Sequence, residues 1–102
     1  MEPPIGWIYR GIMINNNIDR FLNNNDQLVT WPKKHADKLQ VLMYMCSKFE
    51  CKTTYTEKQV NDIIKQWHTF QDWPLLRRGM IDLGLMTRDI EGHAYMRTKK
   101  YD

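Results

Sequence analysis

Two adjacent arginines, Arg77 and Arg78, are the residues whose type and position best suit binding chemistry. They lie within residues 73–83, where apolar side chains recur at helical spacing. At least one of the two guanidinium groups must therefore point away from the buried face of that helix. An outward arginine on a helix can hold O6 and N7 of a guanine, or a phosphate.

The basic residues that follow could extend such a contact. Arg97, Lys99 and Lys100 come after the last apolar segment and could reach the phosphate backbone on either side of the helix. The alternative for the helix arginines is an ion pair within the chain. The candidate partners are Asp72, Asp82 and Asp89, and such a pair would fix the segment after the helix against it.

The sequence offers little for catalysis or for metal binding. It has no nucleophile elbow, glycine-rich phosphate loop or paired-carboxylate motif. Cys46, Cys51, His35 and His68 do not have the paired spacing of structural zinc sites. We therefore expect no enzymatic activity, no cofactor and no metal, with Cys46 serving as a core residue and His35 exposed to solvent.

Three helices are expected to position the arginines, over residues 34–49, 57–67 and 73–83. Thr56 and Gln59 form a capping box, and Asp72 with Pro74 is a typical helix start. Gly84 suits the end of the third helix.

A hairpin is expected after the third helix, and residues 51–55 are expected to be a connector. Residues 85–89 and 94–97 alternate as strands do, on either side of a turn at residues 89–92. The predicted fold class is α+β, mainly α. The expected architecture is a winged helix-turn-helix with three main helices, a two-stranded wing, an N-terminal arm and a short helix.

The N-terminal segment allows two interpretations. Residues 6–14 fit either a strand or an extended arm, ahead of a short helix within residues 15–22. Val41, Tyr44 and Met45 add a second apolar side to the first main helix, for which packing within the chain is favoured over contact with another subunit. The expected division is an arm at residues 1–17, a winged-helix domain at 18–97 and a basic tail at 98–102.

Composition sets the class of protein. The 102 residues carry a net charge of +3 and are 42% hydrophobic, enough for one core and one domain. No signal peptide or membrane span is evident, and two cysteines agree with a reducing compartment. We expect a soluble, cytoplasmic protein with free thiols.

A set of residues, taken together with their spacing along the sequence, resembles the family catalogued as domain of unknown function 2087. The resemblance covers roughly residues 18–97, and it implies a prokaryotic domain that occurs alone or behind the DNA-binding domains of transcription regulators. The activity of that family is undefined. The matching residues are Trp31-Pro-Lys-Lys34, Tyr55-Thr-Glu-Lys-Gln-Val-Asn61, Leu76-Arg-Arg78, Asp82, Gly84, Arg88, Gly92 and Tyr95.

Two functions follow from the predicted architecture. The first is a transcription regulator, or a domain associated with one, that binds double-stranded DNA through the third helix and the wing. The alternative is a module for protein–protein interaction or dimerisation, with a second copy or another transcription regulator as partner. A continuous positive face around the third helix would favour DNA, whereas a mixed or acidic face would favour protein.

Overall fold

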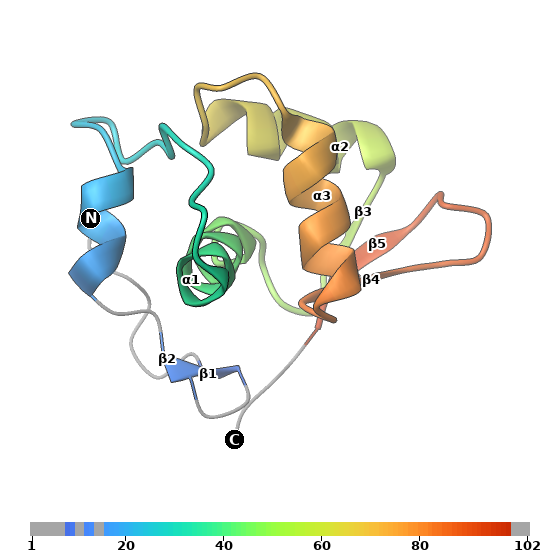
Figure 1. Ribbon diagram of the computed structural model, residues 1–102. Coiled ribbons are helices and arrows are strands. Elements are labelled where there is room, and N and C mark those ends of the chain that lie inside the picture. Colours follow the sequence, from blue (N-terminus) through green and yellow to red (C-terminus); the bar gives the residue numbers. More distant parts are fainter. Residues whose placement is uncertain (1–7, 10–11, 14–15, 99–102) are drawn as a thin grey trace.

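The fold is built from three helices and a small antiparallel sheet, as the computed structural model describes for residues 8–9, 12–13 and 16–98 (Figure 1). The chain is α+β, as expected. The elements in order are β1 (Ile8–Tyr9), β2 (Ile12–Met13), the 3-10 helix η1 (Asn16–Phe21), α1 (His35–Cys46), β3 (Thr54–Tyr55), α2 (Glu57–Gln66), α3 (Trp73–Asp82), β4 (Met86–Arg88) and β5 (Tyr95–Arg97).

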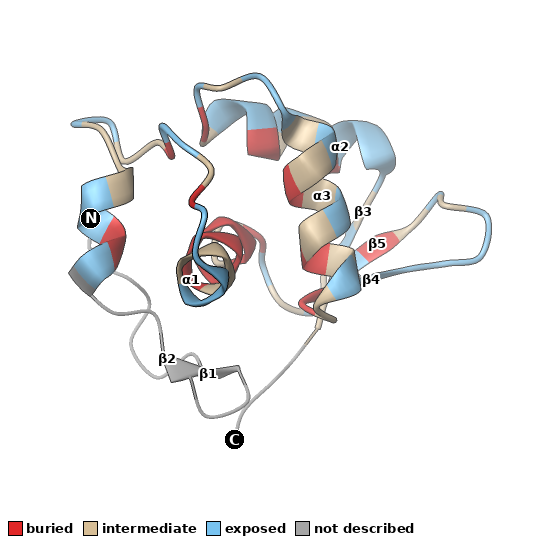
Figure 2. Ribbon diagram, in the orientation of Figure 1, coloured by how far each residue is buried: buried red, intermediate tan, exposed pale blue. Residues whose placement is uncertain are grey.

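Helix α1 lies at the centre of the molecule. Its last two turns, from Gln40 to Cys46, are buried on every side, and Figure 2 shows this helix mostly in red. Val41, Tyr44 and Met45 are each at most 1% exposed, so the second apolar side is covered within the chain and is not a subunit contact. Helix α1 packs against η1 within the chain.

Helix α1 ends three residues before the predicted limit. The amides of Lys48 and Phe49 donate to the carbonyls three residues back, which tightens the chain into a turn after Cys46. Phe49 still enters the core, at 1% exposure, because this turn directs its ring inward. The periodicity of the apolar residues therefore continued beyond the helix itself.

Helices α2 and α3 lie within one residue of their predicted limits. Thr56 and Gln59 form the expected capping box. Asp72 accepts a hydrogen bond from the Leu75 amide, and Gly84 has a φ of 75° just after α3, which a residue with a side chain adopts only with strain. These helices and α1 share one core cluster, which contains the buried residues Leu42, Val60, Ile64, Leu76 and Met80, with Leu39 and Trp67 partly buried against it.

The sheet has three strands in the order β3-β5-β4, where the sequence predicted two. The predicted hairpin is confirmed: Met86, Thr87 and Arg88 of β4 pair antiparallel with β5. The prediction of a connector at residues 51–55 was wrong for Thr54 and Tyr55, which pair with the other edge of β5. A strand of two residues is too short to show the alternation of apolar and polar side chains. Its pairing partner also lies some 40 positions further along the chain, so the sequence did not reveal it.

The segment between η1 and α1 is tied to the α2–α3 turn. The Leu28 amide donates to the Trp67 carbonyl at 2.8 Å, and the Thr69 amide donates to the Leu28 carbonyl at 2.9 Å. Leu28 is fully buried, so this segment is part of the core. Most of the predicted arm, like the tail from Lys99 onward, lies outside the described residues. In the described part of the chain, no helix combines the length and the apolar character needed to cross a membrane.

Candidate nucleic-acid interface

A hollow of about 230 Å³ separates the exposed side of α3 from the β4–β5 hairpin. Three arginines lie around it, and we call it the arginine hollow. Its remaining lining is one carboxylate and three side chains without formal charge. The lining residues are Pro74, Arg77, Arg78, Ile81, Asp82, Arg88 and Tyr95.

Arg77 is held inside the fold. Its Nη1 donates to Oδ1 of Asn61 on α2, and its Nη2 lies 4.0 Å from a carboxylate oxygen of Glu57. The Tyr95 hydroxyl donates to the same Glu57 oxygen at 3.1 Å. Arg77 thereby joins α3 to α2, and through Glu57 to the sheet. The sequence offered an ion pair within the chain as the alternative for Arg77, but with Asp72, Asp82 or Asp89 as its partner.

Arg78 and Arg88 are exposed. Arg78 occupies the middle of a stripe on α3 in which every fourth residue faces solvent, with Pro74 before it and Asp82 after it. Arg88 ends β4 on the opposite wall of the arginine hollow. Neither arginine is in an ion pair with any residue that the structure describes. Their guanidinium groups therefore remain available to a ligand, in contrast to that of Arg77.

The other basic residues predicted for the interface are not brought to this hollow by the described structure. Arg97 is only partly exposed, and its Nη1 donates to the Phe49 carbonyl at 2.8 Å, which fixes β5 to the turn after α1. Lys99 and Lys100 lie outside the described residues. Of the five predicted residues, the structure thus brings together Arg77 and Arg78, and adds Arg88.

His68 was not predicted to have a structural role, and it holds the α2–α3 turn together. Its Nδ1 lies 2.6 Å from the Ile64 carbonyl, and its Nε2 accepts from the Asp72 amide at 3.0 Å. Because Nε2 accepts, Nδ1 is the ring nitrogen that donates to the Ile64 carbonyl. The side chain is 5% exposed. Its sequence signal is its spacing, four residues after Ile64 and four before Asp72.

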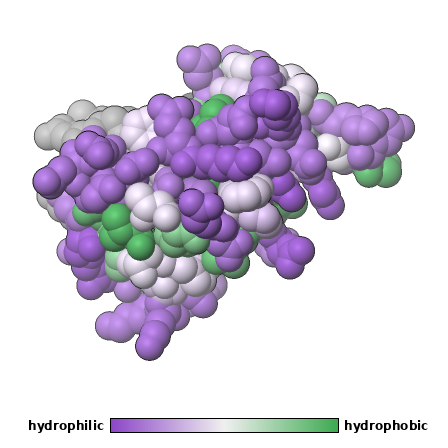
Figure 3. Space-filling model, turned by 90° about the horizontal axis from the view of Figure 1, so that it is seen from above, coloured by the Kyte–Doolittle hydropathy of each residue, from purple (hydrophilic) through white to green (hydrophobic). Residues whose placement is uncertain are grey.

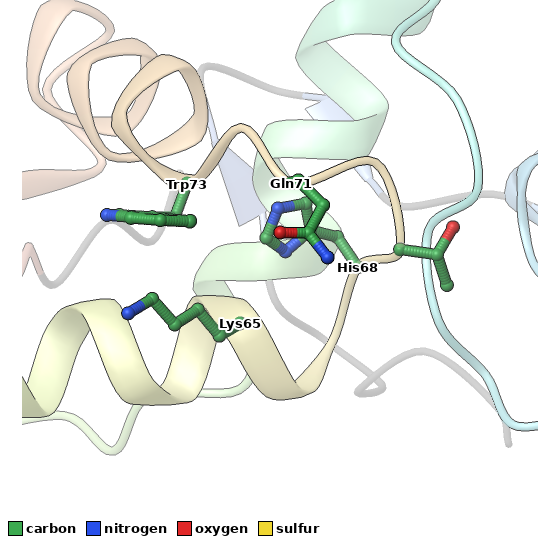
Figure 4. Close-up of a pocket in the computed structure, with 5 residues that line it drawn as sticks. Lys65, His68, Gln71 and Trp73 are labelled. Atoms are coloured by element: carbon green, nitrogen blue, oxygen red, sulfur yellow. The ribbon is translucent and has the colours of Figure 1, made fainter.

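A second hollow, of about 310 Å³, lies beside this turn (Figure 4). The Lys65 ammonium lies 4.1 Å from the centre of the Trp73 ring, a cation–π contact that joins α2 to the start of α3. The hollow is also lined by His68, Thr69 and Gln71. Gln71 has a φ of 58°, so the turn passes through a backbone conformation that glycine adopts more readily.

The core contains a buried thiol. Burial raises the pKa of the Cys46 thiol to about 12, and its Sγ lies 3.4 Å from the Leu85 carbonyl. Cys51 is also a free thiol. Among the residues that the structure describes, no three side chains of His, Cys, Asp or Glu gather as metal ligands would.

A family model matches residues 27–97, and its description is "Uncharacterized protein conserved in bacteria (DUF2087)". The match spans all three α-helices and the three-stranded sheet, including the arginine hollow. The chain belongs to this family, as its sequence resemblance indicated. No curated protein and no solved structure matches the chain.

Proposed function

We propose that the chain is a winged-helix module that binds double-stranded DNA through α3 and the β4–β5 hairpin. The supporting order of elements is α1, β3, α2, α3, β4 and β5, with strand order β3-β5-β4. In a winged helix these positions make α3 the helix that enters the major groove and the hairpin the wing. The biological role we propose is transcription regulation in bacteria, alone or together with another regulator.

The observation that carries this proposal is the pair of unpaired cations, Arg78 and Arg88, facing one hollow from α3 and from the wing. Ten residues make α3 about 15 Å long, and the major groove of B-DNA, about 12 Å wide, admits a helix of this kind. We assign base or phosphate contact to Arg78 and phosphate contact to Arg88. Arg77 positions α3 through Asn61, and Lys99 and Lys100 add phosphate contacts.

A second candidate function is binding of a protein, and charge favours it. Asp82 lies one turn from Arg78 on the exposed stripe, and Asp89 and Glu91 lie in the wing. The face around α3 is therefore mixed rather than continuously positive. These three carboxylates repel phosphates, whereas a protein partner could present charges opposite to each of the positive and negative groups on this face.

We also propose a binding rather than a catalytic role. The thiol of Cys46 is protonated at neutral pH because burial raises its pKa to about 12, and thiols attack as thiolates. Both ring nitrogens of His68 are engaged by backbone groups. The Cys46 thiol and the His68 imidazole are thus committed to the fold.

The test is a titration of fluorescent duplex DNA at low salt, with sites first selected from a random-sequence pool. We expect Arg78→Ala to weaken binding to a selected site by roughly 1 to 3 kcal/mol, the usual value of an arginine that holds guanine. Arg88→Ala is expected to lower affinity for all sequences alike. Lys33→Ala, which removes an exposed lysine ahead of α1, is the matched control and should change little.

Two outcomes would decide against DNA. One is that no selected duplex binds even at low salt. The other is that binding is equally insensitive to Arg78→Ala, Arg88→Ala and Lys33→Ala. Either result would move the assignment to the protein-binding function.

A further inference from the structure

The wing ends in a fully exposed isoleucine. Ile90 has a relative exposure of 105%, so its side chain makes essentially no contact within the chain. The turn that carries it is well bonded: the amides of His93 and Gly92 donate to Asp89, at 2.7 Å to the carboxylate and 3.1 Å to the carbonyl. Figure 3 shows the projecting hairpin with an apolar patch at its end. The isoleucine is thus presented on an ordered projection.

An apolar groove lies elsewhere on the same chain, between α1 and α3. Its volume is about 210 Å³, and four of its lining residues are leucines. The two helices approach closely at its base, because a Cβ added to Gly79 would lie 2.9 Å from the Leu42 side chain. The glycine therefore leaves room for Leu42 and for the groove beside it. The leucines are Leu39, Leu42, Leu75 and Leu83.

The charges of the wing tip and of the groove rim are opposite. Asp89 and Glu91 flank Ile90, and the hydrogen bond from the His93 amide lowers the pKa of Asp89, which keeps that carboxylate ionised. The groove rim contains Lys38 and Arg78, with Asp82 as its one acidic residue. An acidic tip with an apolar centre complements an apolar groove with a mainly basic rim.

We propose that the wing tip of one copy inserts Ile90 into the α1–α3 groove of a second copy. Both halves of the contact exist on this chain, and Ile90, being fully exposed, does not occupy its own groove. Burial of one isoleucine side chain corresponds to roughly a tenfold to hundredfold gain in affinity. The association is therefore weak.

Sedimentation velocity over a concentration series up to about millimolar, without DNA, tests this contact. We expect concentration-dependent association of the parent chain and at least tenfold weaker association of Ile90→Ser. Val29→Ser is the matched control, because Val29 is also an exposed apolar residue, at 40% exposure, but lies outside both surfaces. Circular dichroism checks that each variant is folded.

A charge exchange gives the sharper result. Lys38→Glu at the rim and Glu91→Lys at the tip should each weaken association, and the double variant should recover most of it, because the pair of charges is restored with reversed sign. A chain that stays monomeric throughout overturns the proposal, as does association that Ile90→Ser and Lys38→Glu leave unchanged. A monomer whose groove instead binds an unrelated acidic peptide assigns the groove to another protein. None of these readouts involves DNA, so they stand apart from the outcome of the duplex titration.

Discussion

Replacement of His68 by leucine is expected to loosen the α2–α3 turn, on which the orientation of α3 depends. The imidazole accepts from the Asp72 amide at 3.0 Å and donates to the Ile64 carbonyl at 2.6 Å. Leucine fills a comparable apolar volume but provides neither hydrogen bond. The Ile64 carbonyl retains the Trp67 amide as a donor, at 3.1 Å, whereas the Asp72 amide loses the partner that the imidazole supplies.

The two lost hydrogen bonds determine how far the free energy of unfolding falls. A backbone amide left without a partner in a partly buried position costs about 1 to 3 kcal/mol, and the lost bond to Ile64 about 0.5 to 1.5 kcal/mol. We therefore expect His68→Leu to lower the free energy of unfolding by roughly 2 to 4 kcal/mol. A domain of this size has about 5 to 15 kcal/mol in total, so the loss is large.

Urea denaturation followed by circular dichroism measures this change. With a slope near 2 kcal/mol per molar, the midpoint should fall by about 1 to 2 M. His68→Gln is the matched variant, because its amide oxygen extends to about the position of Nε2 and can accept from the Asp72 amide. It should lose less than His68→Leu. Equal midpoints for the parent chain and His68→Leu, or a greater loss for His68→Gln, would refute this role of the imidazole.

Three further predictions concern the backbone, a phenol and the thiols. Gly92 has a φ of 74° and an added Cβ would meet no atom within 4 Å, so Gly92→Ala should cost about 1 to 2 kcal/mol in thermal denaturation through backbone strain alone; an unchanged melting temperature would contradict this. Burial, with the charges of Asp26 and Asp19, raises the pKa of Tyr44 from 10.0 to about 12. Because the pKa of Tyr44 is higher in the folded state, the stability contributed by its protonated phenol is complete below pH 10 and is lost as pH rises through 12. Ultraviolet titration should therefore show the Tyr44 phenol ionising late. Simultaneous ionisation of all tyrosines would count against this expectation. Iodoacetamide should alkylate Cys51 in the folded chain and Cys46 only in denaturant, because the Cys46 thiol is buried with a pKa of about 12, and mass spectrometry of digests would reveal early labelling of Cys46 if that reasoning fails.

Much of the architecture was predictable because its signals are local. The capping box at Thr56 and the Asp72 and Pro74 start placed both helices to within a residue, since each signal acts on the backbone beside it. The β4–β5 hairpin was found for the same reason. Strand β3 was missed because Thr54 and Tyr55 become a strand only through pairing with β5, which local pattern does not reveal.

The candidate site was predictable only in part. The positions of Arg77 and Arg78 on one helix fixed that they point in different directions, but not which one the fold would use. The fold uses Arg77 internally because its Nη1 donates to Oδ1 of Asn61 on α2. Asn61 is uncharged and lies on another helix, so the pattern of charges in the sequence does not reveal it as the partner. Arg97 was assigned to the surface, yet its Nη1 donates to the Phe49 carbonyl, a partner 48 positions away that local pattern does not reveal.

The most direct test of the central proposal, DNA binding by α3 and the wing, is chemical-shift mapping of the labelled chain titrated with a selected duplex. The proposal expects the largest changes along the exposed stripe of α3, at Arg78 above all, and at Arg88 in the wing. The core of α1 should shift little. No change at saturating duplex, or changes centred away from α3 and the wing, would contradict it.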